Sequence, residues 1–246
     1  MNSLELGLVG NCAINALVDR DGTIVWSCFP RFDGDPVFSR LLDEGGERGF
    51  FAVEVEGTVR REQVYIENTA VLVTRLWDGH GRGVEITDLA PRFESMGRMF
   101  RPAQLLRTVR PLGEAPRITV RLRPHFDYGG EAPTLSRGSH HVRYSGGGQT
   151  LRLSTDAPII FILEETAFHL DRPLAFFFGP DERMATPIAE TARDFIEKTV
   201  GYWQQLSGRL HVPFEWQDAV IRSAITLKLC SFEESGAIIA SPTTSL

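Results

Sequence analysis

Most of the first 180 residues alternate apolar and polar side chains, as a half-buried β-strand requires. The segment 119–123, Thr-Val-Arg-Leu-Arg, is the clearest case, and Asp21-Gly22 between two apolar runs predicts a hairpin turn. Ten or more such segments with polar turns predict antiparallel sheets packed face to face, and therefore a mainly β fold. The Gly- and Ser-rich stretch 129–148 is expected to be a loop. The expected strands are 15–18, 23–28, 51–56, 58–66, 71–77, 84–89, 105–109, 118–122, 149–154, 159–163, 167–170 and 174–178.

The pattern changes to a helical one after residue 183. Thr186 followed by Pro187 predicts a helix start with Thr186 as the N-cap. Apolar residues then recur at helical spacing as far as Leu206, and Gly208 stands where a C-cap is expected. We therefore expect one long amphipathic helix after the β region.

A second helix is expected over 215–234, which contains neither Gly nor Pro. Its apolar residues are spread around most of the circumference, and only a narrow strip that includes Asp218 and Arg222 is polar. A helix of this kind belongs in the interior of a large structure. Because little chain follows it, we expect the segment to open a second unit that this chain does not complete.

Three parts are therefore predicted. Residues 1–183 form a β domain, 184–212 an interdomain linker helix, and 213–246 the truncated start of a helical domain. Because a large apolar surface rarely stays bare, self-association through the last helix is a further expectation.

Charge and composition narrow the range of partners. A net charge of −6, with arginines interspersed among acids, argues against nucleic acid. No apolar run approaches the length of a membrane span, and the N-terminus lacks the features of a signal peptide, so a cytoplasmic location is expected. Cys12, Cys28 and Cys230 are expected to be reduced and buried, with a Cys12–Cys28 bridge as the alternative.

No motif for catalysis, metal or cofactor binding stands out. A glycosidase needs two carboxyl groups about 5–9.5 Å apart across its substrate, and no spacing here identifies such a pair. Adjacent pairs such as Glu164-Glu165 and Glu233-Glu234 are interpreted as surface charge. The histidines lack metal-ligand spacing, and there is no phosphate-binding or dinucleotide fingerprint. We predict no metal and no cofactor.

The segment 26–35 combines Trp, Phe, Arg and Asp side chains where the chain leaves the predicted hairpin. Aromatic and acidic side chains together can hold a sugar ring by stacking and hydrogen bonding. In the alternative interpretation Trp26 and Phe29 are core residues, and Arg31 and Asp33 fix a loop through an ion pair. On the sequence alone the second interpretation is preferred.

This segment belongs to a set of motifs that resembles the start of bacterial glycoside hydrolase family 15 proteins, the glucoamylase-like and trehalase-like enzymes. The resemblance covers nearly the whole chain. The matching stretches are 10–12, 16–18, 21–26, 30–33, 38–43, 68–72, 88–91, 124–129, the helix with Thr199 and Trp203, 224–229 and 240–246.

The resemblance implies an antiparallel β-supersandwich, a linker helix and the first helix of an (α/α)6 barrel that hydrolyses α-glucosidic bonds with inversion. It places both catalytic glutamates beyond residue 246, so no catalytic residue is carried over. The chain alone is expected to be an inactive module that packs against its own catalytic domain and meets an α-glucoside only through it. The alternatives are a glucan-binding module and a free-standing interaction protein.

The resemblance also implies which residues face that domain. Arg31, Phe32 and Asp33 are expected to be exposed in this chain and not buried inside the sandwich. The full predicted interface consists of Arg31, Phe32, Asp33, Trp203, Trp216, Ser241, Thr243 and Thr244.

Overall fold

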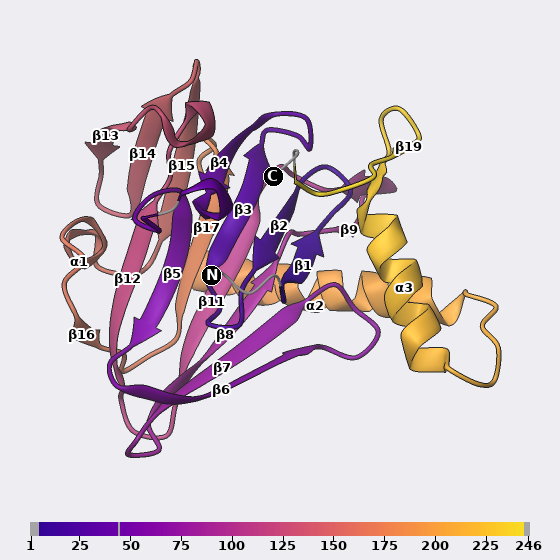
Figure 1. Cartoon of the computed structure of the whole chain (residues 1–246), viewed down its shortest axis with the longest axis horizontal. Coiled ribbons are helices and arrows are strands. Elements are labelled where there is room, and N and C mark those ends of the chain that lie inside the picture. Colours follow the sequence, from indigo (N-terminus) through magenta and orange to yellow (C-terminus); the bar gives the residue numbers. More distant parts are fainter. Residues whose placement is uncertain (1–4, 44, 244–246) are drawn as a thin grey trace.

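Two antiparallel sheets packed face to face make up most of the chain (Figure 1), which confirms the mainly β class. The computed structural model describes residues 5–43 and 45–243. The first sheet has the spatial order β1 (Gly7–Gly10), β2 (Asn15–Val18), β3 (Ile24–Phe29), β5 (Phe50–Val55), β12 (Arg117–Arg123) and β16 (Phe168–His169), and β4 (Asp35–Ser39) pairs with β3. The second has the order β13 (Thr134–Arg137), β14 (His141–Gly146), β15 (Gln149–Thr155), β17 (Leu174–Pro180), β11 (Leu105–Leu112), β8 (Gly83–Leu89), β7 (Leu72–Asp78) and β6 (Thr58–Tyr65).

Smaller elements complete the β region. A separate hairpin joins β9 (Phe93–Ser95) to β10 (Arg98–Phe100), and short 3-10 turns lie at Arg40–Leu42 and Asp127–Gly129.

The predicted hairpin of β2 and β3 is confirmed. Gly22 has a φ of 73°, as its place in the tight turn requires. The Asp19 carboxylate closes the turn, because it accepts hydrogen bonds from the backbone N–H groups of Asp21 (2.9 Å) and Thr23 (2.8 Å).

Aromatic side chains from both sheets fill the space between them. The ring of Phe178 lies 5.6 Å from that of Phe29 and 5.1 Å from that of Phe38, and Phe51 meets Phe176 at 5.8 Å. Such pairs contribute about 0.5–1.5 kcal/mol beyond the burial of their area. The packing of these rings therefore fixes how the two sheets are placed against each other.

One buried ion pair lies in this interior, between two neighbouring strands of the second sheet. Arg107 of β11 contacts Asp88 of β8 through two hydrogen bonds, at 2.7 and 3.0 Å, and both residues are 1% exposed. The same guanidinium donates to the backbone carbonyls of Phe51 (2.8 Å), in β5 of the other sheet, and of Gly22 (2.6 Å), in the turn between β2 and β3. Arg107 thus fastens the second sheet to β5 and to the turn before β3.

Two of the predicted β-region assignments are wrong. The run 159–163, predicted as a strand, is the one-turn helix α1 (Ile159–Leu163), which follows Pro158 and buries Ile159 and Ile162 at helical spacing. A five-residue apolar run does not distinguish a strand from a buried helical turn. The stretch 129–148, predicted as a loop, contains β13 and β14, whose polar side chains give little strand signal.

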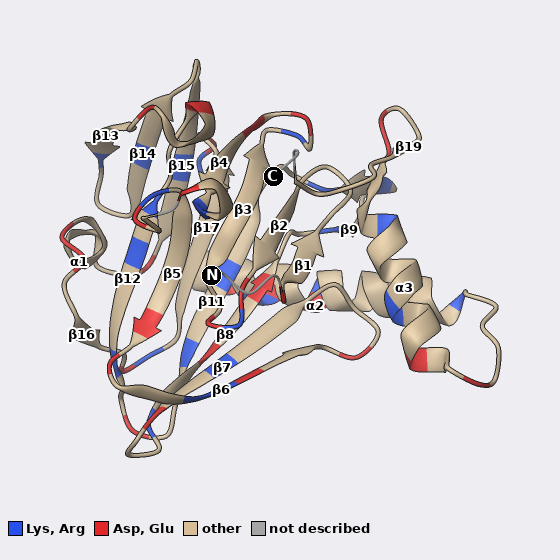
Figure 2. Cartoon of the chain, viewed as in Figure 1, with Lys and Arg blue, Asp and Glu red and all other residues tan. Residues whose placement is uncertain are grey.

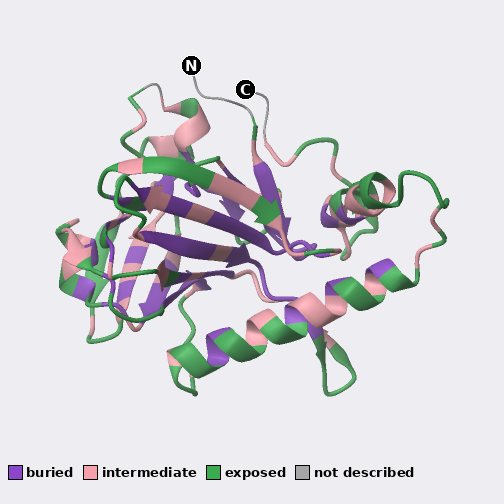
Figure 3. Cartoon of the chain, turned by 90° about the horizontal axis from the view of Figure 1, so that it is seen from below, coloured by how far each residue is buried: buried purple, intermediate pink, exposed green. Residues whose placement is uncertain are grey.

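Helix α2 (Ile188–Gly208) crosses the outer face of the second sheet, with buried and exposed residues following one another along it (Figure 3). Its Ala192 packs with buried residues of the strands, such as Leu89 and Phe177. The long helix after the β region is thus present as predicted. Thr186 is not its N-cap, however, because Pro187 takes that position and the Thr186 hydroxyl pairs with that of Thr191 at 2.6 Å.

Helix α3 (Gln217–Leu229) is shorter than the predicted 215–234. Beyond it the chain forms a small hairpin of β18 (Ser231–Phe232) and β19 (Ala237–Ile238), which turns through Gly236 at a φ of 73°. The apolar residues after Leu229 therefore belong to this hairpin, and the helix ends where the chain reverses.

We expect Arg107→Ala to lower the free energy of unfolding by about 3–5 kcal/mol, because it leaves the Asp88 carboxylate buried without a partner. Urea denaturation followed by circular dichroism measures the change. Arg117→Ala is the matched control, because the pair of Arg117 with Glu56 is exposed and should contribute less than about 1 kcal/mol.

The double substitution Asp88→Leu with Arg107→Met removes both charges and should recover most of the loss. Equal losses for Arg107→Ala and Arg117→Ala would contradict a bracing role for the buried pair.

Candidate functional site

The candidate functional site is the surface where the helices and the C-terminal segment meet β1, β2 and β3. These three strands are buried along their whole length, so both of their faces are covered. One face points into the sandwich, and the other packs against α3 and the end of α2. We call this second layer the junction cluster, which consists of Leu8, Leu17, Val25, Trp26, Cys28, Ala70, Trp203, Ile225 and Leu229.

Two tryptophans form the centre of the junction cluster, and both are 0% exposed. Trp26 comes from β3, and Trp203 comes from the last turns of α2. Trp203 was predicted to face a missing domain, but it lies entirely inside this chain and has no surface left for another one. Ile225 and Leu229 of α3 pack on the same cluster, and their burial contributes about 1.5–3 kcal/mol each.

A polar network holds the end of α3 against the sandwich. Arg92 is 2% exposed and donates to the backbone carbonyl of Asn11 (2.8 Å) and to the Glu233 carboxylate (2.6 Å). Glu233 also pairs with Lys228 (2.5 Å) and Arg101 (3.4 Å). Interpreting Glu233 as surface charge was wrong, because it is the carboxylate at the centre of three basic side chains.

The environment of Glu233 sets its charge state. Burial disfavours the carboxylate form, but the hydrogen bonds from Lys228 and Arg92 outweigh that cost and lower the pKa of Glu233 below its ordinary value. The ionised form therefore holds the segment in place.

Asn11 shapes the tight turn between β1 and β2. Its side-chain amide donates to the carbonyls of Pro91 (3.0 Å) and Pro102 (2.7 Å), and its oxygen accepts from the N–H groups of Ala13 and Ile14. The next residue, Cys12, has a φ of 67°, and its thiol donates to the carbonyl of Lys228 at 3.1 Å. This turn thus contacts the last turn of α3.

The cysteines are free thiols, as the preferred interpretation predicts. Cys12 and Cys28 are buried and Cys230 is half-buried. Burial raises the pKa of the Cys28 thiol to about 12, so it behaves as a small apolar side chain.

The loop between β3 and β4 carries three of the predicted interface residues. Arg31 and Asp33 are exposed and joined by two hydrogen bonds, at 3.0 and 2.7 Å, and Phe32 is half-buried. The rings of Phe32 and Phe232 are 5.7 Å apart, and the Arg31 guanidinium lies 5.5 Å from the Phe232 ring and 3.8 Å from the Glu234 carboxylate. The loop therefore contacts the hairpin that follows α3.

The other predicted interface residues lie at the two ends of the C-terminal part. Trp216, at the start of α3, is 79% exposed. Ser241 is exposed and Thr243 half-buried, and their side-chain hydroxyls are 3.0 Å apart. Between them, the carbonyl of Pro242 accepts a hydrogen bond from the indole N–H of Trp26 at 2.9 Å. Thr244 lies outside the described residues.

Three further large apolar side chains of this C-terminal part are exposed, one before α3, one on it and one after it. Leu227 stands two positions after buried Ile225 and therefore on the opposite face of α3, where it is 61% exposed. Phe214 is 95% exposed and Ile238 65%. Helix α3 is thus apolar toward the sandwich, and its mostly polar outer side carries one large exposed apolar side chain, Leu227.

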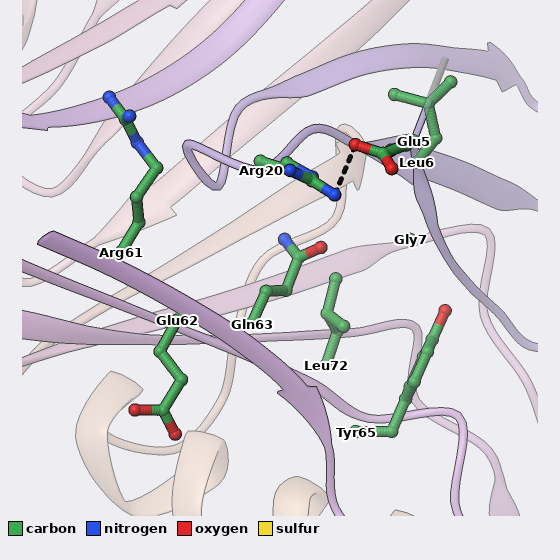
Figure 4. Close-up of a pocket in the computed structure, with 9 residues that line it drawn as sticks. All are labelled: Glu5, Leu6, Gly7, Arg20, Arg61, Glu62, Gln63, Tyr65 and Leu72. Carbon is green, nitrogen blue, oxygen red and sulfur yellow. Dashed lines mark ion pairs between the residues drawn. The ribbon is translucent and has the colours of Figure 1, made fainter. Parts of the chain in front are cut away.

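A cavity of about 470 Å³ lies between the edge strands β1 and β6 (Figure 4). Of its two carboxylates, Glu5 pairs with Arg20, and Glu62 pairs with Arg75 at 2.9 Å. The Tyr65 hydroxyl is hydrogen-bonded to the backbone N–H and carbonyl of Leu8. Among the described residues, both carboxylates that line this cavity are engaged by arginines, so neither is the free acid or base that a glycosidase needs.

Charges are scattered over the strands and helices, with Lys and Arg interspersed among Asp and Glu (Figure 2). Within residues 5–43 and 45–243, no three His, Cys, Asp or Glu side chains are grouped as metal ligands would be. None of the helices in the same ranges combines the length and the apolar character needed to cross a bilayer.

Comparison with known proteins gives consistent matches. A family model described as "Trehalase-like, N-terminal" matches residues 4–167. Trehalase 1 of Sulfolobus acidocaldarius is 30% identical, and the trehalases of Thermoplasma volcanium and Mycolicibacterium smegmatis are each 27% identical, with 98% of this chain covered in all three. The chain spans only about two fifths of the length of these relatives, between 39% and 40%.

We expect Glu233→Gln to weaken the docking of α3 by about 1–2 kcal/mol, because it removes charge from the hydrogen bonds to Arg92 and Lys228. Hydrogen exchange of the amides in 217–239 measures the local opening. Glu234→Gln is the control on the adjacent residue, whose ion pair with Arg31 is longer, at 3.8 Å. Equal exchange in both variants would show that Glu233 does not anchor the segment.

The same contact predicts a pH dependence. Because the folded pKa of Glu233 is lowered, its contribution is complete above the ordinary pKa of about 4.3 and is lost as the pH falls through the folded value. The protection factors of the amides in 217–239, each referenced to the intrinsic exchange rate at that pH, should therefore fall below about pH 4 in the wild type, and Glu233→Gln should reduce that fall.

Proposed function

Since the chain belongs to the trehalase-like N-terminal family, we propose that it is the non-catalytic N-terminal part of a family 15 glycoside hydrolase. The catalytic part is then an (α/α)6 barrel that hydrolyses α-glucosidic bonds with inversion. Trehalose is the first substrate to test, because the relatives are named trehalases. Glucoamylase-type substrates such as maltose and isomaltose also contain α-glucosidic bonds and are the next to test.

The observation that carries this proposal is the exposure of large apolar side chains on and beside α3, a helix whose other side is docked. Its inner side packs on the junction cluster, whereas Trp216 and Leu227 on its outer side are exposed. Large apolar side chains left exposed on and beside a docked helix suit a surface that a further layer covers. We propose that 1–183 is the β domain, 184–212 the linker helix and 213–246 the first part of the helical domain that covers the outer side of α3.

The carboxylates of the described part support a non-catalytic role. Inverting hydrolysis needs a general acid and a general base about 6.5–9.5 Å apart, with room for a water and the sugar between them. Glu85 instead pairs with Arg75 and Arg110, Glu165 with Arg123, and Glu233 with Arg92. These carboxylates are used as structural ion-pair partners.

The alternative of a glucan-binding module loses its main support. Trp26 and Phe29, the aromatic residues proposed to stack on a sugar, are both 0% exposed. Phe32 is half-buried and packs on Phe232. The location is proposed to be cytoplasmic, which suits three free thiols.

The purified chain is expected to release no glucose from trehalose, maltose or isomaltose, because the acid and base belong to the catalytic part. A coupled glucose assay measures the rate. A catalytic part produced together with this chain should hydrolyse trehalose, whereas the chain alone should not. Turnover that rises in proportion to the concentration of the pure chain would refute the non-catalytic assignment.

A further inference from the structure

The segment after α3 is tied to the sandwich at three separate places. Phe232 packs on Phe32, Glu233 binds Arg92, and Pro242 accepts a hydrogen bond from Trp26. The N–H of Ile239 also donates to the carbonyl of Cys230 at 2.9 Å, which closes the base of the hairpin. The chain from 230 to 243 is therefore held near its start and again near its end.

The Trp26 contact differs from the other two. Its donor is fully buried, and its acceptor lies 216 positions later in the chain, at the far end of the segment. A buried indole N–H usually requires a partner, and Pro242 offers a carbonyl but has no N–H of its own. The contact therefore fixes the position of this carbonyl.

The second tryptophan of the junction cluster makes no such hydrogen bond. Trp203 is equally buried, but its indole N–H has no hydrogen-bond partner within the described part of the chain. Packing alone thus accounts for Trp203, whereas Trp26 combines packing with one long-range hydrogen bond.

We propose that Trp26 is a positioning residue, which sets the course of Ser241–Thr243 and, through it, the placement of the catalytic part on the β domain. This inference rests on the proposed function. The carbonyl of Pro242 stands 13 positions after the end of α3, so a shift there alters the path of the chain although α3 stays docked. A displacement of about 1 Å in a catalytic group can lower the rate by roughly 100-fold.

The first test uses this chain and needs no activity. In Trp26→Phe the heteronuclear ¹⁵N NOE values of Ser241 and Thr243 should fall, because the hydrogen bond that restrains them is gone. Trp203→Phe removes a similar volume from the same cluster and should leave these values unchanged. 3-Benzothienylalanine at position 26 keeps the double ring and removes only the N–H. This replacement should lower the NOE values of Ser241 and Thr243 as Trp26→Phe does, and it decides the test alone where Trp26→Phe does not fold.

The second test uses the protein that carries the catalytic part. Trp26→Phe should lower kcat for trehalose by about 10-fold with KM changed less than about twofold, since binding groups stay intact while the placement of the reacting groups is altered. Trp203→Phe should leave kcat within about twofold of the wild type.

Unchanged NOE values in both Trp26 variants would overturn the inference, and so would equal losses of kcat in Trp26→Phe and Trp203→Phe. A longer protein that hydrolyses no α-glucoside would instead defeat the proposed function. The NOE result would then still decide whether Trp26 restrains the segment.

Discussion

The guanidinium of Arg107 joins the two sheets in the dry interior of the sandwich, and the position of β3 depends on it. The group neutralises Asp88 in its own sheet and donates to Phe51 in the other and to Gly22 in the turn before β3. Because Gly22 belongs to the turn that starts β3, the same contact fixes the strand that carries Trp26. Burying two charges has a large desolvation penalty, which offsets much of their attraction. The main effect of this pair is therefore to set the position of one sheet relative to the other.

β3 is the element through which the interior and the C-terminal part are connected. Phe29 packs on Phe178 between the sheets, whereas Trp26 belongs to the junction cluster on the other face. Antiparallel strands commonly leave one face to solvent, but all six residues of β3 are buried. A strand covered on both sides transmits a shift of either layer to the other, because packed interiors deform little.

The sequence predicts local patterns well and distant pairings poorly. Alternation predicted most of the strands, and Asp21-Gly22 predicted the first hairpin. The run 159–163 was misassigned because five apolar residues fit a strand and a helical turn equally, and the helix 215–234 was predicted too long because its composition contains no stop before Gly236. The contact of Arg92 with Glu233 spans 141 positions, and no spacing rule predicts such a pair.

The predicted interface residues show the same contrast between local patterns and distant contacts. Exposure of Arg31 and Asp33 agrees with their expected place at a surface, yet Trp203 is enclosed within the chain, since a helical pattern does not show which neighbour its apolar side meets. The enclosure of Trp203 follows from α3, which covers one side of the junction cluster, whereas Trp216 and Leu227 stay exposed. The first helix of the proposed helical domain thus docks on the β domain before any partner covers its outer face. A catalytic part that packs on that face inherits its orientation from contacts already made within this chain.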